Sequence, residues 1–130
     1  SKDGNCNSTK TFEGMSLEIA RQEKLRSSNK FVQVGCALSN GVSSYNSYIR
    51  KETRDTTLHA EMRALGECAR NGIPTEGCIL YVTLSPCIDC AKIIISSGIS
   101  EVHYDEIDQT SPNALELLKE AGVKTVLTSI

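Results

Sequence analysis

The sequence predicts an α/β fold in which helices cover both faces of a β-sheet. Helix-forming and strand-forming segments alternate through the second half of the chain, a pattern typical of layered sheets. The run "CILYVTL" at 78–84 is nearly all apolar, as expected for a central strand buried on both faces. The chain of 130 residues is long enough for one core. We therefore predict a flexible polar arm over residues 1–14 and a single domain over residues 15–130.

The first half of the chain predicts one helix and a β-hairpin. Residues 15–28 have a helix-forming composition, and "FVQVGCAL" at 31–38 is rich in residues that favour extended backbone. Asn40 and Gly41 form a strong hairpin turn motif, so "VSSYNSYI" at 42–49 is predicted as the return strand. The charged segment "RKETRDTT" that follows is predicted as a loop.

A second helix is predicted over residues 58–70. Thr56 or Thr57 is placed to cap its start. Gly72 is placed to end it, and Pro74 prevents its renewal.

Proline and glycine positions predict two further helices. Pro86 and Pro112 lie where helix starts are expected, because the first helical N–H groups have no partner within a helix and proline lacks that group. Gly98 and Gly122 follow the expected helix ends. The elements predicted after the apolar strand are a helix at 86–97, a strand at 100–104, a helix at 112–121 and a strand at 123–130.

Charge and apolar content argue against two classes of partner. The formal net charge is −2 and the sequence pI is near 5.7, whereas a large nucleic-acid surface usually carries a clear basic excess. No apolar run approaches the ~18 residues that a membrane span needs. We therefore expect neither a membrane nor a nucleic acid as partner.

The six cysteines do not predict a disulfide scaffold. Cys87 and Cys90 have a metal-binding spacing, and no secretory signal is visible, so a reducing cytoplasm is the expected compartment. The remaining cysteines are predicted to have no chemical role: Cys6 on the arm, and Cys36, Cys68 and Cys78 as buried free thiols in apolar segments.

Two short motifs carry side chains suited to metal chemistry. "HAEMRAL" begins at His59 and places Glu61 two residues later, and "SPCIDC" ends with Cys87 and Cys90. Each motif lies where a polar connection becomes a helix, and the i, i+3 spacing puts both sulfurs on one helix face. Helix N-termini favour anions, which suits thiolates. Imidazole nitrogen and thiolate sulfur bind zinc, and three protein ligands are typical of a catalytic zinc, so we predict bound Zn²⁺.

Glu61 is predicted to move protons beside that metal. Two residues after His59, its carboxylate can approach the open coordination position without being a ligand. Zinc lowers the pKa of the water that it binds toward ~7. Glu61 can then take a proton and return it to a substrate nitrogen.

Simpler interpretations of these residues stay open. A lone histidine is usually a packing or surface residue, and a lone Cys-x-x-Cys can be a structural zinc site or a redox pair. A structural site needs a fourth ligand, for which Cys78, His103 and the other cysteines are candidates by type. A non-catalytic zinc module has no need of Glu61, so that glutamate favours an enzyme.

The two motifs together carry a resemblance to a known family. His-x-Glu followed by Pro-Cys-x-x-Cys is the signature of zinc-dependent nucleobase deaminases. The block "LYVTLSPCIDCAKIIISSGISEVHY" resembles the corresponding block of the deoxycytidylate deaminases, in the cytidine deaminase-like superfamily. The resemblance implies a three-layer α-β-α sandwich with a mixed five-stranded sheet whose last two strands are parallel. It also implies a homo-oligomer that hydrolyses dCMP, a small-molecule nucleotide, to dUMP and ammonia for thymidylate synthesis.

The resemblance implies roles for further residues. Asn46, in "SYNSY", matches the Tyr-Asn segment of the family and is expected to contact the base or the sugar. The backbone around Ala60, Ser85 and Pro86 is expected to contact the reacting end of the base. The cations expected at the 5′-phosphate are Arg50, Lys51 and Arg54, with the segment 104–111 or a neighbouring subunit as alternatives.

The chain departs from the family pattern in three places. Ser44 and Ser47 replace the glycines that usually flank Tyr-Asn, and Arg63 stands where the family often has asparagine. The connection between Asn46 and His59 is short, whereas many members carry an insert there that is associated with regulation by dCTP and dTTP. Because this short connection resembles that of tRNA adenosine deaminases, tRNA adenosine stays an alternative substrate. Cytosine, guanine and cytidine, the substrates of other deaminases, also stay open.

Overall fold

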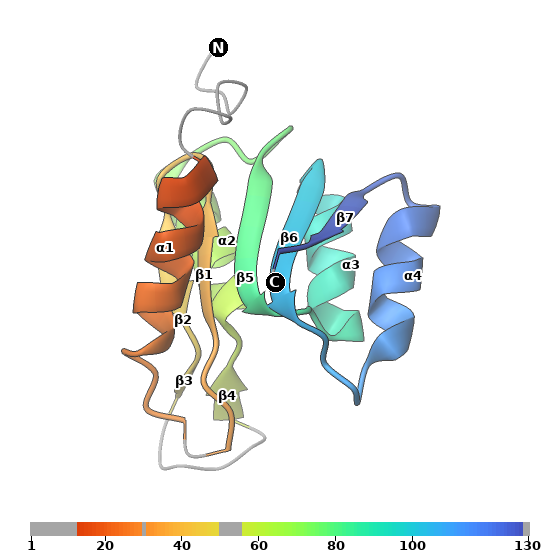
Figure 1. The fold of residues 1–130 in the computed structure, drawn as a ribbon. Coiled ribbons are helices and arrows are strands. Elements are labelled where there is room, and N and C mark those ends of the chain that lie inside the picture. Colours follow the sequence, from red (N-terminus) through yellow and green to blue (C-terminus); the bar gives the residue numbers. More distant parts are fainter. Residues whose placement is uncertain (1–12, 30, 50–55, 129–130) are drawn as a thin grey trace.

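Two helical layers enclose one five-stranded sheet in the computed structural model, which describes residues 13–29, 31–49 and 56–128 (Figure 1). Helix α1 covers one face of the sheet, and α2, α3 and α4 lie on the other. This arrangement confirms the predicted sandwich. The helices are α1 (Glu13–Lys24), α2 (Ala60–Asn71), α3 (Ile88–Ser96) and α4 (Pro112–Glu120). The strands are β1 (Gly35–Leu38), β2 (Ser43–Tyr45), β3 (Ser47–Tyr48), β4 (Thr57–Leu58), β5 (Ile79–Leu84), β6 (Glu101–Glu106) and β7 (Lys124–Leu127).

The sheet is mixed, and its strand order is β2-β1-β5-β6-β7. Strand β1 pairs antiparallel with both β2 and β5, whereas β5, β6 and β7 run parallel. The parallel pairs follow from connectivity, because α3 joins β5 to β6 and α4 joins β6 to β7, and parallel neighbours need such crossovers. The prediction that the last two strands are parallel is confirmed.

Alternating side chains of the central strands build a core on each face. Leu80 and Val82 of β5 lie in the larger core, under α2, α3 and α4, whereas Tyr81 lies with Ala20 and Ala37 under α1. All three β5 side chains are at most 1% exposed. The "CILYVTL" segment is therefore the central strand, buried on both faces, that its composition predicts.

Gly35 allows α1 to lie directly against the start of β1. A Cβ atom at this position would lie 2.0 Å from the Ala20 carbonyl oxygen and 2.3 Å from the Lys24 nitrogen. Only a residue without a side chain fits between the two backbones. This close approach fixes the C-terminal end of α1 beside the start of β1 and the end of β5, near the functional residues.

The predicted return strand over residues 42–49 is interrupted at Asn46. Strand β2 ends at Tyr45, and β3 leaves the main sheet to pair with β4 as a separate two-stranded sheet. At the break, the Asn46 side chain turns to the backbone of residues 32–34 instead of continuing the ladder. The predicted charged loop falls mostly on residues 50–55, outside the described residues.

The two helix starts nearest the motifs differ from the prediction. Helix α2 has His59, not Thr56 or Thr57, at its N-cap position, and Thr57 belongs to β4. The threonines were wrong as caps because β4 continues to Leu58 and delays the helix. Helix α3 begins at Ile88, after an N-cap at Cys87. The predicted stop after α2 is confirmed, because Gly72 adopts a left-handed φ of 65°.

Four of the five described cysteines carry free thiols. Cys36 and Cys68 are free and buried, as predicted. Cys78 is disulfide-bonded, so its prediction as a free thiol was wrong; an apolar setting indicates burial but does not distinguish a thiol from a half-cystine. Cys87 and Cys90 are also free and remain available to a metal. Within the described ranges, no helix combines the length and apolar character needed to cross a membrane.

Candidate metal centre and active site

The starts of α2 and α3 bring three ligating side chains together. His59 ends an extended stretch, with φ −69° and ψ 150°, and its imidazole makes no capping hydrogen bond to α2. Instead, His59 Nδ1 lies 3.5 Å from the Cys87 sulfur and 3.3 Å from the Cys90 sulfur. The three ligand atoms all lie within 4.8 Å of one another. The residues that the sequence predicts as zinc ligands therefore converge on one point.

The first turn of α3 prepares one sulfur as an anion. Cys87 is the N-cap residue, and its sulfur accepts a long hydrogen bond of 3.5 Å from the Cys90 N–H. The hydrogen bond with the Cys90 side chain is the largest effect that lowers the pKa of Cys87, to about 4, and contact with His59 adds to it. The same side-chain interaction raises the pKa of the Cys90 thiol. The pKa of His59 is raised by its hydrogen bond with Cys87.

The donor set fits zinc with one coordination position open. One imidazole nitrogen and two sulfurs are the ligands of the Cys₂His type of catalytic zinc site. Two of the candidate fourth ligands have other partners: His103 hydrogen-bonds the Glu101 carboxylate at 2.8 Å, and Cys78 is disulfide-bonded. Neither belongs to the ligand group found among the described residues. Neither residue therefore supplies the fourth ligand that a structural zinc site needs.

Glu61 lies beside this group but is not part of it. It occupies the first turn of α2, is 4% exposed and lines the same cavity as His59 and Cys87. Burial raises the pKa of its carboxyl group to about 7. A carboxyl group with this pKa can hold a proton and release it near neutral pH, which is what general acid–base catalysis requires.

A cavity of about 530 Å³ opens above these residues. Its size is within the range of small-molecule sites. Its floor consists of His59, Glu61 and Cys87, and apolar and polar side chains from five segments form its wall. The wall residues are Asn29, Phe31, Val32, Val34, Asn46, Thr57, Ala60, Leu84, Ser85, Ile107, Asp108, Gln109 and Thr110.

The predicted substrate-binding residues divide into three groups. Asn46, Ala60 and Ser85 line the cavity, as their predicted roles require. Pro86 is fully buried and is not among the cavity-lining residues. The predicted phosphate-binding cations Arg50, Lys51 and Arg54 lie outside the described residues.

Asn46 and Ser85 also hold the wall in place. Asn46 Oδ1 accepts a hydrogen bond from the Val34 N–H at 2.9 Å, and its Nδ2 donates to the Val32 carbonyl at 2.8 Å. Ser85 Oγ accepts from the Asp108 N–H at 2.7 Å. Each side chain keeps capacity for a second hydrogen bond, so both can support the wall and face a ligand.

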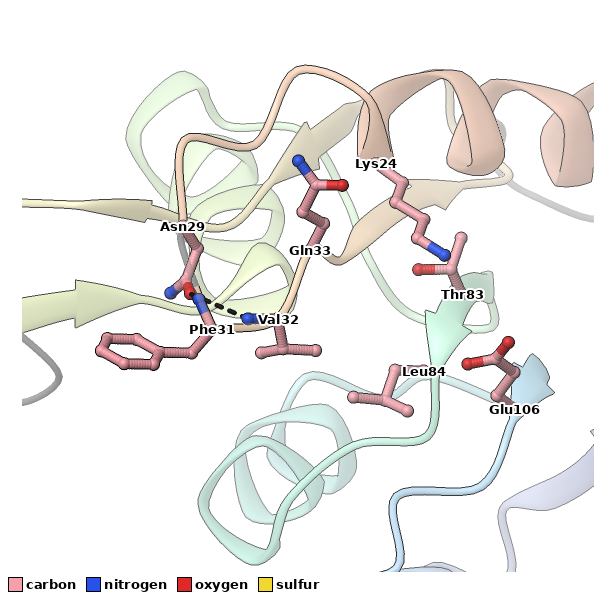
Figure 2. A pocket seen from close by; sticks show the side chains of 8 residues that line it. All are labelled: Lys24, Asn29, Phe31, Val32, Gln33, Thr83, Leu84 and Glu106. Atoms are coloured by element: carbon pink, nitrogen blue, oxygen red, sulfur yellow. Dashed lines mark hydrogen bonds between the residues drawn. The ribbon is translucent and has the colours of Figure 1, made fainter. Parts of the chain in front are cut away.

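Sequence reasoning missed the segment at residues 29–32. Asn29 Oδ1 accepts hydrogen bonds from the N–H groups of Phe31 and Val32, at 2.6 and 2.9 Å, and so forms an Asx turn that presents both side chains (Figure 2). Phe31 and Val32 are 57% and 45% exposed, which is unusual for apolar residues. The asparagine before an apolar run was the available indication of a turn.

The segment 107–110 was identified only as a fallback for the phosphate. It follows β6 directly, and ligands of parallel sheets bind beyond the carboxyl ends of the strands, so its position was predictable. Asp108 shapes it, because Asp108 Oδ1 accepts hydrogen bonds from the Thr110 N–H at 2.9 Å and the Thr110 hydroxyl at 2.6 Å.

A second cavity of about 400 Å³ adjoins the first. The two share Asn29, Phe31, Val32 and Leu84, and Figure 2 shows these side chains between the turn and the end of β5. The second cavity adds Lys24, Gln33, Thr83 and Glu106. Lys24 is the one lysine or arginine among the described residues that line either cavity.

The family comparison agrees with this geometry. A family model for the cytidine and deoxycytidylate deaminase zinc-binding region matches residues 8–106. The chain belongs to this family. The match includes both motifs, and a His-Cys-Cys group within a zinc-binding family region fits Zn²⁺ as the cofactor.

Individual relatives match over shorter stretches. The chain is 51% identical over 67 residues to the ComE operon protein 2 of Bacillus subtilis (strain 168), and 47% identical over 68 residues to the deoxycytidylate deaminase of Enterobacteria phage T2. Each match covers 52% of this chain, and 35% and 36% of the two relatives. The matched region thus spans about a third of these curated relatives.

A solved structure extends the likeness of fold to nearly the whole chain. The dCMP deaminase of cyanophage S-TIM5, in complex with dCMP and dUMP, superimposes with a TM-score of 0.81. The match covers 91% of this chain and 97% of the cyanophage chain, at 24% sequence identity. The cyanophage deaminase therefore shares the fold described above.

Proposed function

We propose that this chain hydrolyses dCMP to dUMP and ammonia. The observation that supports it best is the convergence of His59, Cys87 and Cys90 into one ligand group beside Glu61, with His59, Glu61 and Cys87 at the floor of one cavity. Three ligating side chains beside a buried carboxyl group are the parts that a zinc-dependent deaminase needs. The relatives named deoxycytidylate deaminase, and the fold shared with a deaminase that binds dCMP and dUMP, support this choice of substrate.

The side chains divide the work of the reaction. His59, Cys87 and Cys90 are proposed to hold the zinc ion, which supplies the Lewis acidity that activates water. Glu61 takes one proton from the attacking water and delivers it to N3 of cytosine. It then takes the second proton of that water and delivers it to the amine, which leaves C4 as ammonia while the water oxygen stays on C4. The raised pKa of Glu61 suits this shuttle, because the group must be both acid and base within one cycle.

The cavity wall is proposed to orient the nucleotide. Asn46 and Ser85 offer polar atoms, Val34 and Leu84 offer apolar surface, and Ala60 brings backbone next to Glu61. Excluding bulk water from such a site strengthens each polar contact within it. We propose that Arg50, Lys51 and Arg54, which lie outside the described residues in the connection from β3 to β4, bind the 5′-phosphate.

A substrate panel with product identification tests the function. Zinc-loaded protein is assayed for ammonia release from dCMP, deoxycytidine, cytidine, cytosine, guanine and tRNA that contains adenosine. We expect dCMP to be the preferred substrate and dUMP the product. Preference for any other member contradicts the proposed substrate, and no ammonia from the whole panel contradicts the enzyme class.

Two further expectations complete the proposal. A homo-oligomer is expected from the resemblance, and light scattering of the purified protein measures its mass. A cytoplasmic location stays a prediction from cysteine usage. The disulfide at Cys78 argues against it, because disulfides persist mainly in oxidising compartments.

A further inference from the structure

Arg63 connects the helix that carries Glu61 to the two residues that flank Asn46. From the second turn of α2, its Nη1 donates hydrogen bonds to the Tyr45 carbonyl at 3.1 Å and to the Ser47 hydroxyl at 2.9 Å. Its guanidinium carbon also lies 4.3 Å from the centre of the Tyr45 ring. The side chain therefore holds the residues on both sides of Asn46.

Asn46 transmits this hold to the cavity wall. Its amide bonds the backbone of both Val32 and Val34, and its own N–H donates to the Val34 carbonyl at 3.1 Å. Asn46 is 3% exposed, and it lines the cavity together with both valines. Arg63 of α2 thus holds the two neighbours of Asn46 in the chain, and the Asn46 side chain holds the segment 32–34.

The site of Arg63 is built by several groups. A second guanidinium, that of Arg26, lies 4.7 Å from the centre of the same Tyr45 ring, and Arg26 is held by the Glu23 carboxylate at 3.1 Å. Cation–π contacts and charge-assisted hydrogen bonds both depend on geometry, so they fix orientation as well as adding stability. These side-chain interactions, and not strand pairing, fix the backbone where the chain passes from β2 to β3 at Asn46.

We propose that Arg63 is a positioning residue for nucleotide binding, which acts through Asn46 to set the distance between the catalytic floor and the wall at residues 32–34. This inference rests on the proposed function, because it assigns the wall to the substrate of that site. Arg63 does not line the cavity, so it acts on the substrate only through Asn46 and the valines.

The role predicts a specific kinetic pattern. The wall contacts parts of the nucleotide that do not react, and such contacts are equally strong in the ground state and the transition state. Their loss raises KM and leaves kcat nearly unchanged. For Arg63→Ala we expect KM for dCMP to rise about tenfold, the lower end of the range for hydrogen bonds to charged groups.

Matched variants separate positioning from simple destabilisation. Arg63→Lys keeps a cation that can donate to Ser47 or the Tyr45 carbonyl, so it should recover part of the lost KM. Arg70→Ala removes an exposed arginine at the end of the same helix and should leave KM at the wild-type value. The double variant Arg63→Ala, Asn46→Ala should raise KM little more than Asn46→Ala alone, because both act through the same contacts.

A second readout does not depend on the substrate. Hydrogen exchange of the Val34 amide reports the bond to Asn46 Oδ1, and the Ala91 amide, which donates to the Cys87 carbonyl, reports the start of α3. In zinc-loaded Arg63→Ala we expect faster exchange at Val34, unchanged exchange at Ala91 and unchanged zinc content.

The outcomes distinguish the two proposals. Raised KM with partial recovery by lysine and faster Val34 exchange supports the positioning role. Wild-type KM and wild-type Val34 exchange in Arg63→Ala overturn it, as does a loss of zinc, which would place the effect at the floor. If the wild-type protein deaminates none of the panel, the proposed function fails, and Val34 exchange then decides the positioning role alone.

Discussion

The floor and the wall of the main cavity are built in different ways. The floor consists of His59, Glu61 and Cys87, each at the N-cap or in the first turn of a helix, and Cys90 in the first turn of α3 completes the ligand group beside them. The wall comes largely from segments with little regular structure, at residues 29–34, around Asn46 and at 107–110. In the wall, side-chain amides, carboxylates and hydroxyls bond backbone N–H groups that no helix or sheet satisfies.

This difference separates chemistry from recognition. Helix starts hold the ligands in a geometry that the rigid backbone of the two helices sets. The wall depends on individual side-chain bonds, each of modest strength, so single substitutions can change its shape. Substitutions in the floor should therefore abolish turnover, and those in the wall should alter affinity or stability.

The largest effect is expected from removal of the two sulfur ligands. The double variant Cys87→Ser, Cys90→Ser should lose zinc and all measurable deamination, because a single imidazole cannot retain the ion. Metal content by atomic emission and ammonia release measure the two effects. Cys68→Ala, at a buried free cysteine of α2 outside the ligand group, should keep stoichiometric zinc, about one per chain. Full zinc occupancy in the double variant would contradict the assignment of the floor.

Glu61→Gln should retain zinc and lose turnover by at least ~100-fold, the lower scale of acid–base effects. The amide keeps the size of the side chain but cannot shuttle a proton. Single-turnover kinetics with dCMP measure the chemical step. Glu67→Gln, on the same helix but away from the cavity, is the matched control. Near-normal turnover in Glu61→Gln would remove that carboxylate from the mechanism.

The phosphate contact is tested by a ratio of efficiencies. Arg50→Ala, Lys51→Ala and Arg54→Ala are each assayed on dCMP and on deoxycytidine. Loss of a true phosphate contact should lower efficiency on dCMP by roughly 1.5–3 kcal/mol and hardly affect deoxycytidine. Lys24→Ala is assayed beside them, because Lys24 lines the adjoining cavity. If the ratio of the two efficiencies changes only in Lys24→Ala, the phosphate binds in the adjoining cavity.

Asn46→Ala should weaken the wall without affecting the metal. It leaves the Val34 N–H without its acceptor and lowers the free energy of unfolding by about 1–3 kcal/mol, with a rise in KM. Urea denaturation measures the first effect and steady-state kinetics the second. Asn71→Ala, which removes an exposed bond to the Glu67 carbonyl, should cost less. If both variants lower the free energy of unfolding equally, the Asn46 hydrogen bonds stabilise the protein no more than the exposed bond of Asn71 does.

The smallest effect is expected at Ser85. Ser85→Ala removes the acceptor for the Asp108 N–H and should lower the free energy of unfolding by about 0.5–1.5 kcal/mol, while zinc content is unchanged. The same denaturation experiment measures it. A loss of zinc in Ser85→Ala would show that floor and wall are not independent.

The floor was predictable from sequence, and most of the wall was not. His59, Cys87 and Cys90 follow a motif with fixed spacing, and helix geometry turns that spacing into position. The apolar run at β5 likewise fixes the centre of the sheet. Asn46 was identified through family resemblance, but nothing in the sequence shows that its amide bonds Val32 and Val34. Such bonds join segments that are distant along the chain, and neither periodicity nor local propensity encodes that pairing.

Misplaced helix starts show the same limit. Thr56 and Thr57 have the right chemistry for an N-cap, but pairing of β4 with β3 keeps the chain extended to Leu58. Tertiary pairing overrode local preference there. The free thiol predicted at Cys78 was wrong for a related reason, because a disulfide depends on a partner that the local sequence does not reveal.

The backbone contact at Gly35 has a consequence for how this chain can vary. Because no side chain separates the C-terminal half of α1 from the start of β1 at Gly35, the spacing at this point is set by main-chain atoms. A survey of all substitutions should therefore find position 35 intolerant even of alanine. The backbone nitrogen of Lys24 faces this glycine, so a helix displaced by a larger residue at position 35 would also displace Lys24 from the adjoining cavity.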